Sequence, residues 1–436
     1  MADHAFQPET LAIHAGQIPD PATGARALPI YQTTSFVFDS ADHAASLFNL
    51  QTFGNIYSRL SNPTVAALEE RVAALEGGRA GLASASGMAA EAMALMTILQ
   101  QGDHVVAAGA LYGGSVTMLA VSLKRFGIET TFVDATEPEA FAAAMQPNTR
   151  AVFAESLGNP SLTVLDIAAV ADVAHAHGVP LIVDNTVPSP FLCNPIRFGA
   201  DVVVHSATKY LGGHGTTLAG MMVESGKFPW DNGKFPGMTE PSPGYHGVKF
   251  YETFGDFGFS MRARMEVLRV YGSTLSPFAA WQILQGIESL HVRMERHCAN
   301  TLRVAQNLED DPRVSWVNYP GSPKHPQYGL VQKQMRAVDG LPGASGLLAF
   351  GVKGGLEAGI RFIEAAEFMS HLANIGDTRT LIIHPASTTH RQLEADQQRA
   401  AGVLPDMVRM SVGIEHIDDI LWDIDQALAA ASKPRE

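Results

Sequence analysis

The hydrophobic pattern of the chain first becomes regular in the segment 63–76. Four apolar residues in it are separated by three, four and three positions: Val65, Leu68, Val72 and Leu75. This spacing places them on one face of an α-helix. Asn62 can cap the helix and Pro63 suits its first turn. The glycine pair after Glu76 predicts where the helix ends.

Downstream of this helix, short apolar runs alternate with helical patterns. The runs with the composition of buried strands are 104–107, 130–133, 151–155, 181–184, 201–205 and 218–223. The segments with helical periodicity between them are 88–99, 115–126, 138–145 and 167–177. Strands that are nearly unbroken in apolar residues are typical of a parallel sheet buried on both faces. The sequence therefore predicts an α/β fold with a mainly parallel sheet in an αβα layer.

Three other parts of the chain have a different pattern. Residues 1–62 contain several prolines and aromatics with little helical periodicity, and we expect an extended arm that contacts a neighbouring subunit. The segment 226–259 is dense in glycine, proline and aromatic residues, which predicts a long irregular insertion. We expect residues 63–285 to form the large domain, which contains this insertion. The remaining residues, 286–436, are expected to form a C-terminal α+β domain.

Strands of this C-terminal domain are expected near 314–318, 346–352, 381–383 and 408–412. An amphipathic helix is expected after Ile417.

Charge and composition narrow the possible functions. The 436 residues include 30 basic and 44 acidic ones, a formal net charge of −14. This balance argues against nucleic-acid binding and against docking on anionic membranes. No apolar run approaches the ~20 residues that a membrane span needs, and the first residues do not resemble a secretory signal. We therefore expect a cytoplasmic protein, with Cys193 and Cys298 as free thiols.

Polar residues follow three neighbouring strands at the edge where parallel sheets bind ligands. Asn159 follows the strand 151–155, Asp184 ends the next strand, and Lys209 follows the third. Pyridoxal phosphate needs a lysine for a Schiff base and an acid paired with its pyridinium nitrogen. Lys209 and Asp184 are the candidates for these two tasks. No metal is expected, since His175 and His177 lie two positions apart on a helix and face different ways.

A phosphate site is predicted where the helical pattern 88–99 begins. Gly87 and Met88 open that helix, whose free N–H groups favour an anion. Ser206 and Thr208, shortly before Lys209, add hydroxyl donors. Tyr112 is placed to stack on the cofactor ring and to help move protons.

Tyr57 and Arg59 at the end of the arm add a phenol and a guanidinium. Because they belong to the arm, we expect them to reach the cofactor of a neighbouring subunit.

These residues stand in motifs that resemble the Cys/Met-metabolism family of pyridoxal-phosphate enzymes. The motifs are YSRLSNPT at 57–64, SGM at 86–88, LYGG at 111–114, ESLGNP at 155–160, VDNT at 183–186, HSATKYLGGHG at 205–215, ANIGDTRTLIIHPASTTH at 373–390 and VRMSVGIEH at 408–416. The resemblance implies the aspartate-aminotransferase-like fold (fold type I) with pyridoxal 5'-phosphate bound to Lys209. It also implies Asn159 near the phenolic oxygen of the ring and Arg409 on the substrate α-carboxylate, with Asn374 at the substrate side.

Features of the chain indicate a subgroup of this family. The insertion 226–259 and Asn374 resemble the O-acetylhomoserine sulfhydrylase pattern, and Gly114 stands where methionine γ-lyases have cysteine. The implied activity is γ-replacement, in which O-acetylhomoserine and sulfide (or a thiol) give homocysteine (or its thioether) and acetate. Cystathionine γ-synthase, O-succinylhomoserine sulfhydrylase and methionine γ-lyase remain alternatives.

The resemblance also implies a homo-oligomer, a tetramer built as a dimer of dimers. A nicotinamide oxidoreductase is disfavoured because Leu218 occupies the third glycine position of the nearest glycine motif. The aromatic insertion is expected to help exclude water from the active site.

Overall fold

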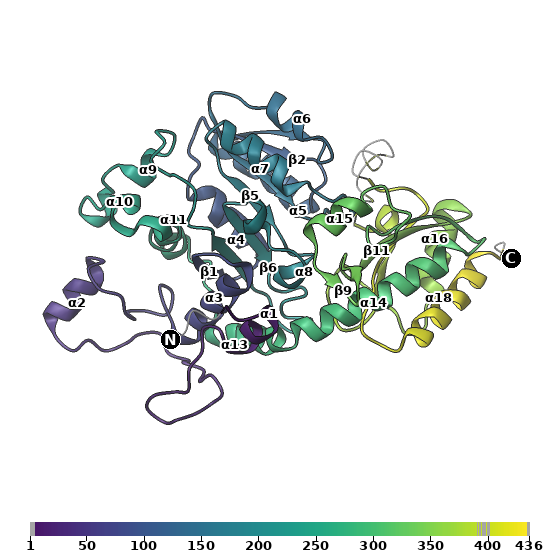
Figure 1. The fold of residues 1–436 in the computed structure, drawn as a ribbon, viewed down its shortest axis with the longest axis horizontal. Helices are drawn as coiled ribbons and strands as arrows, with labels where there is room; N and C mark the ends of the chain where they lie inside the picture. Colours follow the sequence, from purple (N-terminus) through teal and green to yellow (C-terminus); the bar gives the residue numbers. More distant parts are fainter. Residues whose placement is uncertain (1–4, 390, 392–393, 395–397, 399–401, 434–436) are drawn as a thin grey trace.

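A seven-stranded sheet forms the centre of the computed structural model, which describes residues 5–389, 391, 394, 398 and 402–433 (Figure 1). Its strands are β1 (Ala80–Ser84), β2 (His104–Ala108), β3 (Glu129–Val133), β4 (Thr149–Glu155), β5 (Leu181–Asp184), β6 (Val202–Ser206) and β7 (Gly220–Glu224). Their order is β1-β7-β6-β5-β4-β2-β3. Only β7 runs antiparallel to its neighbours in this sheet. The predicted mainly parallel sheet is therefore confirmed.

Helices cover the sheet as expected for an αβα layer (Figure 1). They are α3 (Pro63–Glu76), α4 (Gly87–Met96), α5 (Gly113–Thr117), α6 (Pro138–Ala143), α7 (Ile167–Ala176) and α8 (Ser189–Leu192). The side chain of Asn62 accepts a hydrogen bond from the N–H of Thr64, and Gly77 ends α3 in the left-handed conformation. The predicted helix 115–126 is only partly α-helical, because a π-helix and a 3₁₀-helix follow α5 up to Phe126.

A smaller five-stranded sheet lies in the C-terminal part, in the order β12-β13-β14-β11-β8. Its strands are β8 (Val314–Asn318), β11 (Leu347–Val352), β12 (Ser370–His371), β13 (Leu381–Ile383) and β14 (Met407–Ser411). Helices α16 (Gly355–Ala365) and α18 (Ile417–Ala431) pack on each other beside it. A hairpin of β9 (Ala337–Val338) and β10 (Leu341–Pro342), preceded by α15 (Tyr328–Gln334), completes this part. The proposed boundary after residue 285 falls inside α13 (Pro277–Glu288) and stays a prediction.

The arm has more regular structure than its sequence predicted. It contains α1 (Pro8–His14), which packs against α3 and α13, and α2 (Ala41–Phe48). Ser40 starts α2 by accepting a hydrogen bond from the N–H of His43. The predicted extended arm thus contains two short helices, and Ser40 is the sequence signal for the second of them.

The insertion 226–259 also contains short helices, including α9 (Pro236–Thr239) and α10 (Phe250–Phe254). Their aromatic side chains form a packed cluster, in which the rings of Trp230 and Phe259 stack with centroids 4.8 Å apart. Helices α9 and α10 project from one side of the large sheet (Figure 1). The segment predicted as a long irregular insertion thus contains short helices, and buried aromatic rings order it.

A buried arginine connects the segment after β6 to the long helices that lead into the C-terminal part. Arg293 lies on α14 (Leu290–Glu309) and is 4% exposed. Its guanidinium donates hydrogen bonds to the carbonyl oxygens of Tyr210 at 2.7 Å and Gly286 at 2.6 Å. Because an apolar replacement would take the Arg293 donor from the carbonyl oxygen of Tyr210 and remove the shortest hydrogen bond to that of Gly286, we infer that Arg293 fixes the segment containing Lys209.

Replacing Arg293 with methionine keeps much of the apolar stem but removes these donors. We expect Arg293→Met to lower the free energy of unfolding by about 2–4 kcal/mol, in the range for loss of a buried charged donor. Urea unfolding followed by circular dichroism measures the change. Arg296→Met, at an exposed position of the same helix, is the control. Equal stability of the two variants would contradict the assigned role.

Candidate active site

One cavity brings together all the predicted site residues except Tyr57 and Arg59. It lies at the carboxyl ends of β4, β5 and β6, where the first turn of α4 and residues of the C-terminal part meet. The predicted residues that line it are Gly87, Met88, Tyr112, Asn159, Asp184, Ser206, Thr208, Lys209, Asn374 and Arg409. Residues spread from Gly87 to Arg409 thus converge on one place, and those that follow β4, β5 and β6 do so because parallel strands align their carboxyl ends.

Lys209 follows β6 and points its amine towards the C-terminal part. Nζ donates a hydrogen bond to Oδ1 of Asn374 at 2.5 Å. Burial lowers the pKa of Lys209 to about 8, and the positive charge of Arg409 contributes in the same direction. No carboxylate among the described residues forms an ion pair with this amine. A lysine with a lowered pKa and no ion-pair partner loses its proton more readily, and the neutral amine can attack a carbonyl carbon.

Asp184 ends β5 and also lines the cavity. Its Oδ1 accepts a hydrogen bond from the N–H of Thr186 at 2.8 Å. The hydroxyl oxygen of Thr186 in turn accepts one from the N–H of Ser206 at 2.7 Å, which links the ends of β5 and β6. Burial raises the pKa of Asp184. A positively charged ring nitrogen placed against this carboxylate would favour its ionised form.

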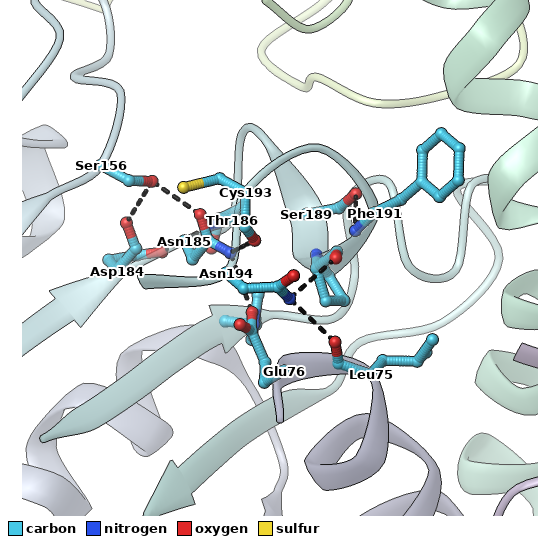
Figure 2. Close-up of polar contacts among 12 residues, drawn as sticks. Leu75, Glu76, Ser156, Asp184, Asn185, Thr186, Ser189, Phe191, Cys193 and Asn194 are labelled. Carbon is cyan, nitrogen blue, oxygen red and sulfur yellow. Dashed lines mark hydrogen bonds and ion pairs between the residues drawn. The ribbon is translucent and has the colours of Figure 1, made fainter. Parts of the chain in front are cut away.

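A buried hydrogen-bond network fixes the backbone behind Asp184 (Figure 2). The hydroxyl of Ser156 donates to the carbonyl oxygen of Asp184 at 3.2 Å or to Oδ1 of Asn185 at 2.8 Å. Asn185 Nδ2 donates to Oε1 of Glu76 at 2.8 Å and to the carbonyl oxygen of Cys193 at 2.9 Å. The carboxylate of Asp184 is therefore held by a rigid turn and not by a flexible loop.

The start of α4 fits a phosphate group. Ser86 caps the helix by accepting a hydrogen bond from the N–H of Ala89, and the N–H groups of the first turn face the cavity. A Cβ at Gly87 would lie 2.6 Å from Cβ of Ser206, so only glycine allows this close approach. With an anion site, a buried amine and a buried acid around one cavity, the residues present fit pyridoxal phosphate.

Arg409 on β14 brings the C-terminal part to the cavity. Its guanidinium donates to Oδ1 of Asn159 at 2.9 Å and to the carbonyl oxygen of Asn374 at 3.2 Å. Burial lowers the pKa of Arg409 to about 10, yet the group stays charged near neutral pH. Both hydrogen bonds are to uncharged oxygens, so the charge of the guanidinium is available for an anionic ligand.

Tyr112 follows β2 and presents its ring at the mouth of the cavity. Its backbone N–H donates to Oε1 of Glu155, and its side chain is half exposed (52%). A Cβ at Gly114 would lie 2.5 Å from Cε1 of Tyr112. Any residue larger than glycine at position 114 would therefore displace the Tyr112 ring. The position is compatible with stacking on a planar ligand.

Tyr57 and Arg59 do not line the cavity of their own chain. Arg59 donates a hydrogen bond to the carbonyl oxygen of Arg269 at 2.5 Å, and its guanidinium lies 5.4 Å from the centroid of the Tyr57 ring. Their contact with the cofactor of a neighbouring subunit stays a prediction.

The sequence analysis gave no role to Glu91, Glu155 and Thr186, which also line the cavity. Glu91 stands four residues after Gly87 on α4, and this helical spacing was the available signal. No residue of the insertion 226–259 lines the cavity. The expectation that this insertion excludes water is therefore not met within one chain.

A family model described as Cys/Met metabolism PLP-dependent enzyme matches residues 9–429 of this chain. The chain belongs to this family. Pyridoxal phosphate is accordingly its cofactor.

Three relatives illustrate the similarity. The chain is 54% identical to an O-acetyl-L-homoserine sulfhydrylase of Leptospira meyeri, with 97% of each chain covered. It is 52% identical to O-acetyl-L-homoserine sulfhydrylase 1 of Thermus thermophilus, over 97% of this chain and 99% of the relative. A crystal structure from Campylobacter jejuni, described as an O-acetylhomoserine (thiol)-lyase with an N'-pyridoxyl-lysine-5'-monophosphate, superposes with a TM-score of 0.93 at 40% identity, covering 97% of this chain and all of that one.

These comparisons confirm the family and the fold predicted from the sequence, and they leave the roles of single residues to experiment. Within the described residues, no helix has the length and apolar character needed to cross a membrane. The same residues contain no group of three or more side chains arranged to hold a metal ion.

The electrostatics of Lys209 give a pH-dependent prediction. Only the neutral amine reacts with pyridoxal phosphate, so the rate of attachment in the apoprotein should rise with pH through about 8. Arg409→Gln removes a positive charge that disfavours protonation of Lys209 and should move this rise to higher pH. Stopped-flow absorbance of the bound cofactor measures it, with Arg296→Gln as the remote control. An unchanged midpoint in Arg409→Gln would refute the electrostatic coupling.

Proposed function

We propose that this protein is a pyridoxal-phosphate-dependent O-acetylhomoserine sulfhydrylase that works in the cytoplasm. It would replace the acetoxy group at Cγ of O-acetylhomoserine by sulfide or a thiol, so that a C–O bond breaks, a C–S bond forms, and homocysteine (or its thioether) and acetate are released. The observation that carries this proposal is the convergence of Lys209, Asp184 and Arg409 on one cavity in a chain with sulfhydrylase relatives over its full length. Two free, buried cysteines are compatible with a reducing compartment.

Pyridoxal phosphate, when bound, supplies an electron sink that stabilises negative charge at Cα of the amino-acid substrate. Asp184 would hold the pyridine nitrogen protonated, and Asn159 would lie near the phenolic oxygen. Gly87, Met88, Ser206 and Thr208 would hold the phosphate group of the same subunit, joined by Tyr57 and Arg59 of a neighbouring one.

Lys209 would bond to the cofactor at rest and, once freed by the substrate amine, remove the proton from Cα. Its lowered pKa suits this task, because a base must be neutral to accept a proton. The carbonyl oxygen of the Asn374 side chain lies within hydrogen-bond distance of Nζ and would orient the amine between successive proton transfers. Tyr112 would stack on the ring and assist with its hydroxyl.

Arg409 would bind the α-carboxylate of the amino-acid substrate. Its hydrogen bonds to Asn159 and to the backbone of Asn374 hold the guanidinium plane in place before the substrate arrives. A carboxylate that pairs with two N–H groups of this plane is fixed in direction as well as in position.

The substrate and the thiol are supported by relatives and not by the geometry of the cavity. A homocysteine synthase of Schizosaccharomyces pombe, 48% identical over 97% of this chain, agrees with homocysteine as the product. The proposal would be contradicted by a different main activity, namely that of a cystathionine γ-synthase, an O-succinylhomoserine sulfhydrylase or a methionine γ-lyase.

Purified protein supplied with O-acetylhomoserine and sulfide is expected to form homocysteine and acetate, measured by chromatography. Lys209→Ala should reduce turnover by several orders of magnitude, because it removes both the cofactor anchor and the base. Lys227→Ala, outside the cavity, is the matched control. Faster formation of cystathionine from O-succinylhomoserine and cysteine, or of an α-keto acid and ammonia, would assign the protein to another branch of the family.

We also propose a tetramer built as a dimer of dimers, in which the arm completes the site of the neighbouring subunit. Tyr57 and Arg59 are not among the residues that line the cavity of their own chain, which supports shared sites. Arg59→Ala and Lys209→Ala, each poorly active alone, should then regain part of the activity when combined in one oligomer. Purified heterodimers, made with two affinity tags, would show no recovery if each chain completed its own site.

A further inference from the structure

Glu91 lies beside Asp184 in the cavity, although neither the proposed reaction nor the phosphate site uses it. It stands one turn after Gly87 on α4 and therefore faces the same side as the start of the helix. Its side chain is only 3% exposed. No described residue provides a hydrogen-bond partner for its Oε2. A buried carboxyl oxygen in this position needs an explanation.

Three carboxyl groups share this cavity: Glu91 from α4, Glu155 from β4 and Asp184 from β5. Burial raises the pKa of Glu155 well above its usual range, and the neighbouring charge of Asp184 adds to the effect. Burial likewise raises the pKa of Glu91, again with Asp184 contributing. Three carboxylates buried in one cavity repel one another, which favours a proton on at least one of them.

The hydrogen-bond donors around each acid indicate where the proton resides. Glu155 accepts backbone N–H groups at both oxygens, one from Tyr112 and one from Asn159 at 3.0 Å. Asp184 accepts the N–H of Thr186. No backbone N–H of the described residues donates to the side chain of Glu91, whose polar neighbours are Asp184 and the hydroxyl of Ser115. The carboxyl group with the fewest donors is the one that stays neutral.

We propose that Glu91 is a positioning residue whose protonated carboxyl group donates a hydrogen bond to Asp184, keeping Asp184 ionised and aimed at the ring nitrogen of bound pyridoxal phosphate. Among the other ionisable groups around this pair, Glu155 favours a proton on its neighbours and His205 on β6 favours the anion of Asp184. Lys209 and Arg409 line the same cavity, and a positive charge on either also favours that anion. The inference rests on the proposed role of Asp184 and is independent of the ester and the thiol.

Two substitutions of Glu91 distinguish a protonated side chain at this position from a charged one. In Glu91→Gln the amide can donate the same hydrogen bond to Asp184, so the affinity for pyridoxal phosphate should stay close to that of the parent protein. Glu91→Ala removes the donor and should weaken cofactor binding roughly tenfold or more, the usual effect of losing a hydrogen bond to a charged group. Absorbance titration of the apoprotein with pyridoxal phosphate measures both affinities.

Met93→Ala is the control for lost packing, since Met93 lies on the same helix in the core and outside the cavity. It should lower the melting temperature without changing the cofactor affinity. Equal affinity of Glu91→Ala and the parent would overturn the proposal. Binding weakened as strongly in Glu91→Gln as in Glu91→Ala would also overturn it, and so would tighter binding in Glu91→Gln, which would mean a charged Glu91.

Infrared spectroscopy tests the proton directly and does not require that Glu91→Ala folds. The parent protein at neutral pH should show the C=O stretching band of a protonated carboxylic acid that is absent from Glu91→Gln. Identical spectra in this region would refute a protonated Glu91. Because neither readout needs turnover, an inactive sulfhydrylase assay would count against the proposed function and not against the role of Glu91.

Discussion

The removal of Lys209 and Asp184 from water is the constraint on which the site depends. A buried amine prefers to be neutral and a buried carboxyl group prefers to be protonated, and burial is the largest influence on the pKa of both groups here. The amine needs this effect, since a neutral lysine is the useful form. The acid needs the opposite, because only its anion stabilises a pyridinium ring. The surroundings of the two residues differ accordingly: Lys209 has an amide oxygen and a cation beside it, whereas Asp184 receives a backbone N–H.

The positions of Lys209 and Asp184 relative to each other depend on both the large sheet and the C-terminal part of the chain. The lysine segment is attached to α13 and α14 by Arg293, and the amine is met by Asn374 from the C-terminal part. Arg409 then joins the same part to Asn159 at the end of β4. A small shift of the C-terminal sheet would therefore move the candidate carboxylate site and the orientation of the amine together.

The sequence predicted the sheet and most of the cavity because both follow from local patterns. Unbroken apolar runs identified β2 to β7 within a few residues, and the polar residues after β4, β5 and β6 indicated the ligand edge. Strand β1 was missed, since its small residues carry no β-type signal before it pairs with β7. Helix α16 was missed as well, in a segment where Gly355 and Gly359 are poor helix formers.

Glu91 shows why a site is harder to predict from sequence than a fold. A glutamate inside an apolar helical pattern is ordinarily assigned to a solvated face. Its spacing from Gly87 places it on the side of α4 that carries the phosphate site, but the local sequence does not show that this side meets the end of β5. Its importance arises only from the proximity of two other acids on separate strands. The pattern of donors around those acids then decides which of them keeps the proton. This information belongs to the tertiary structure, because the competing groups are far apart along the chain.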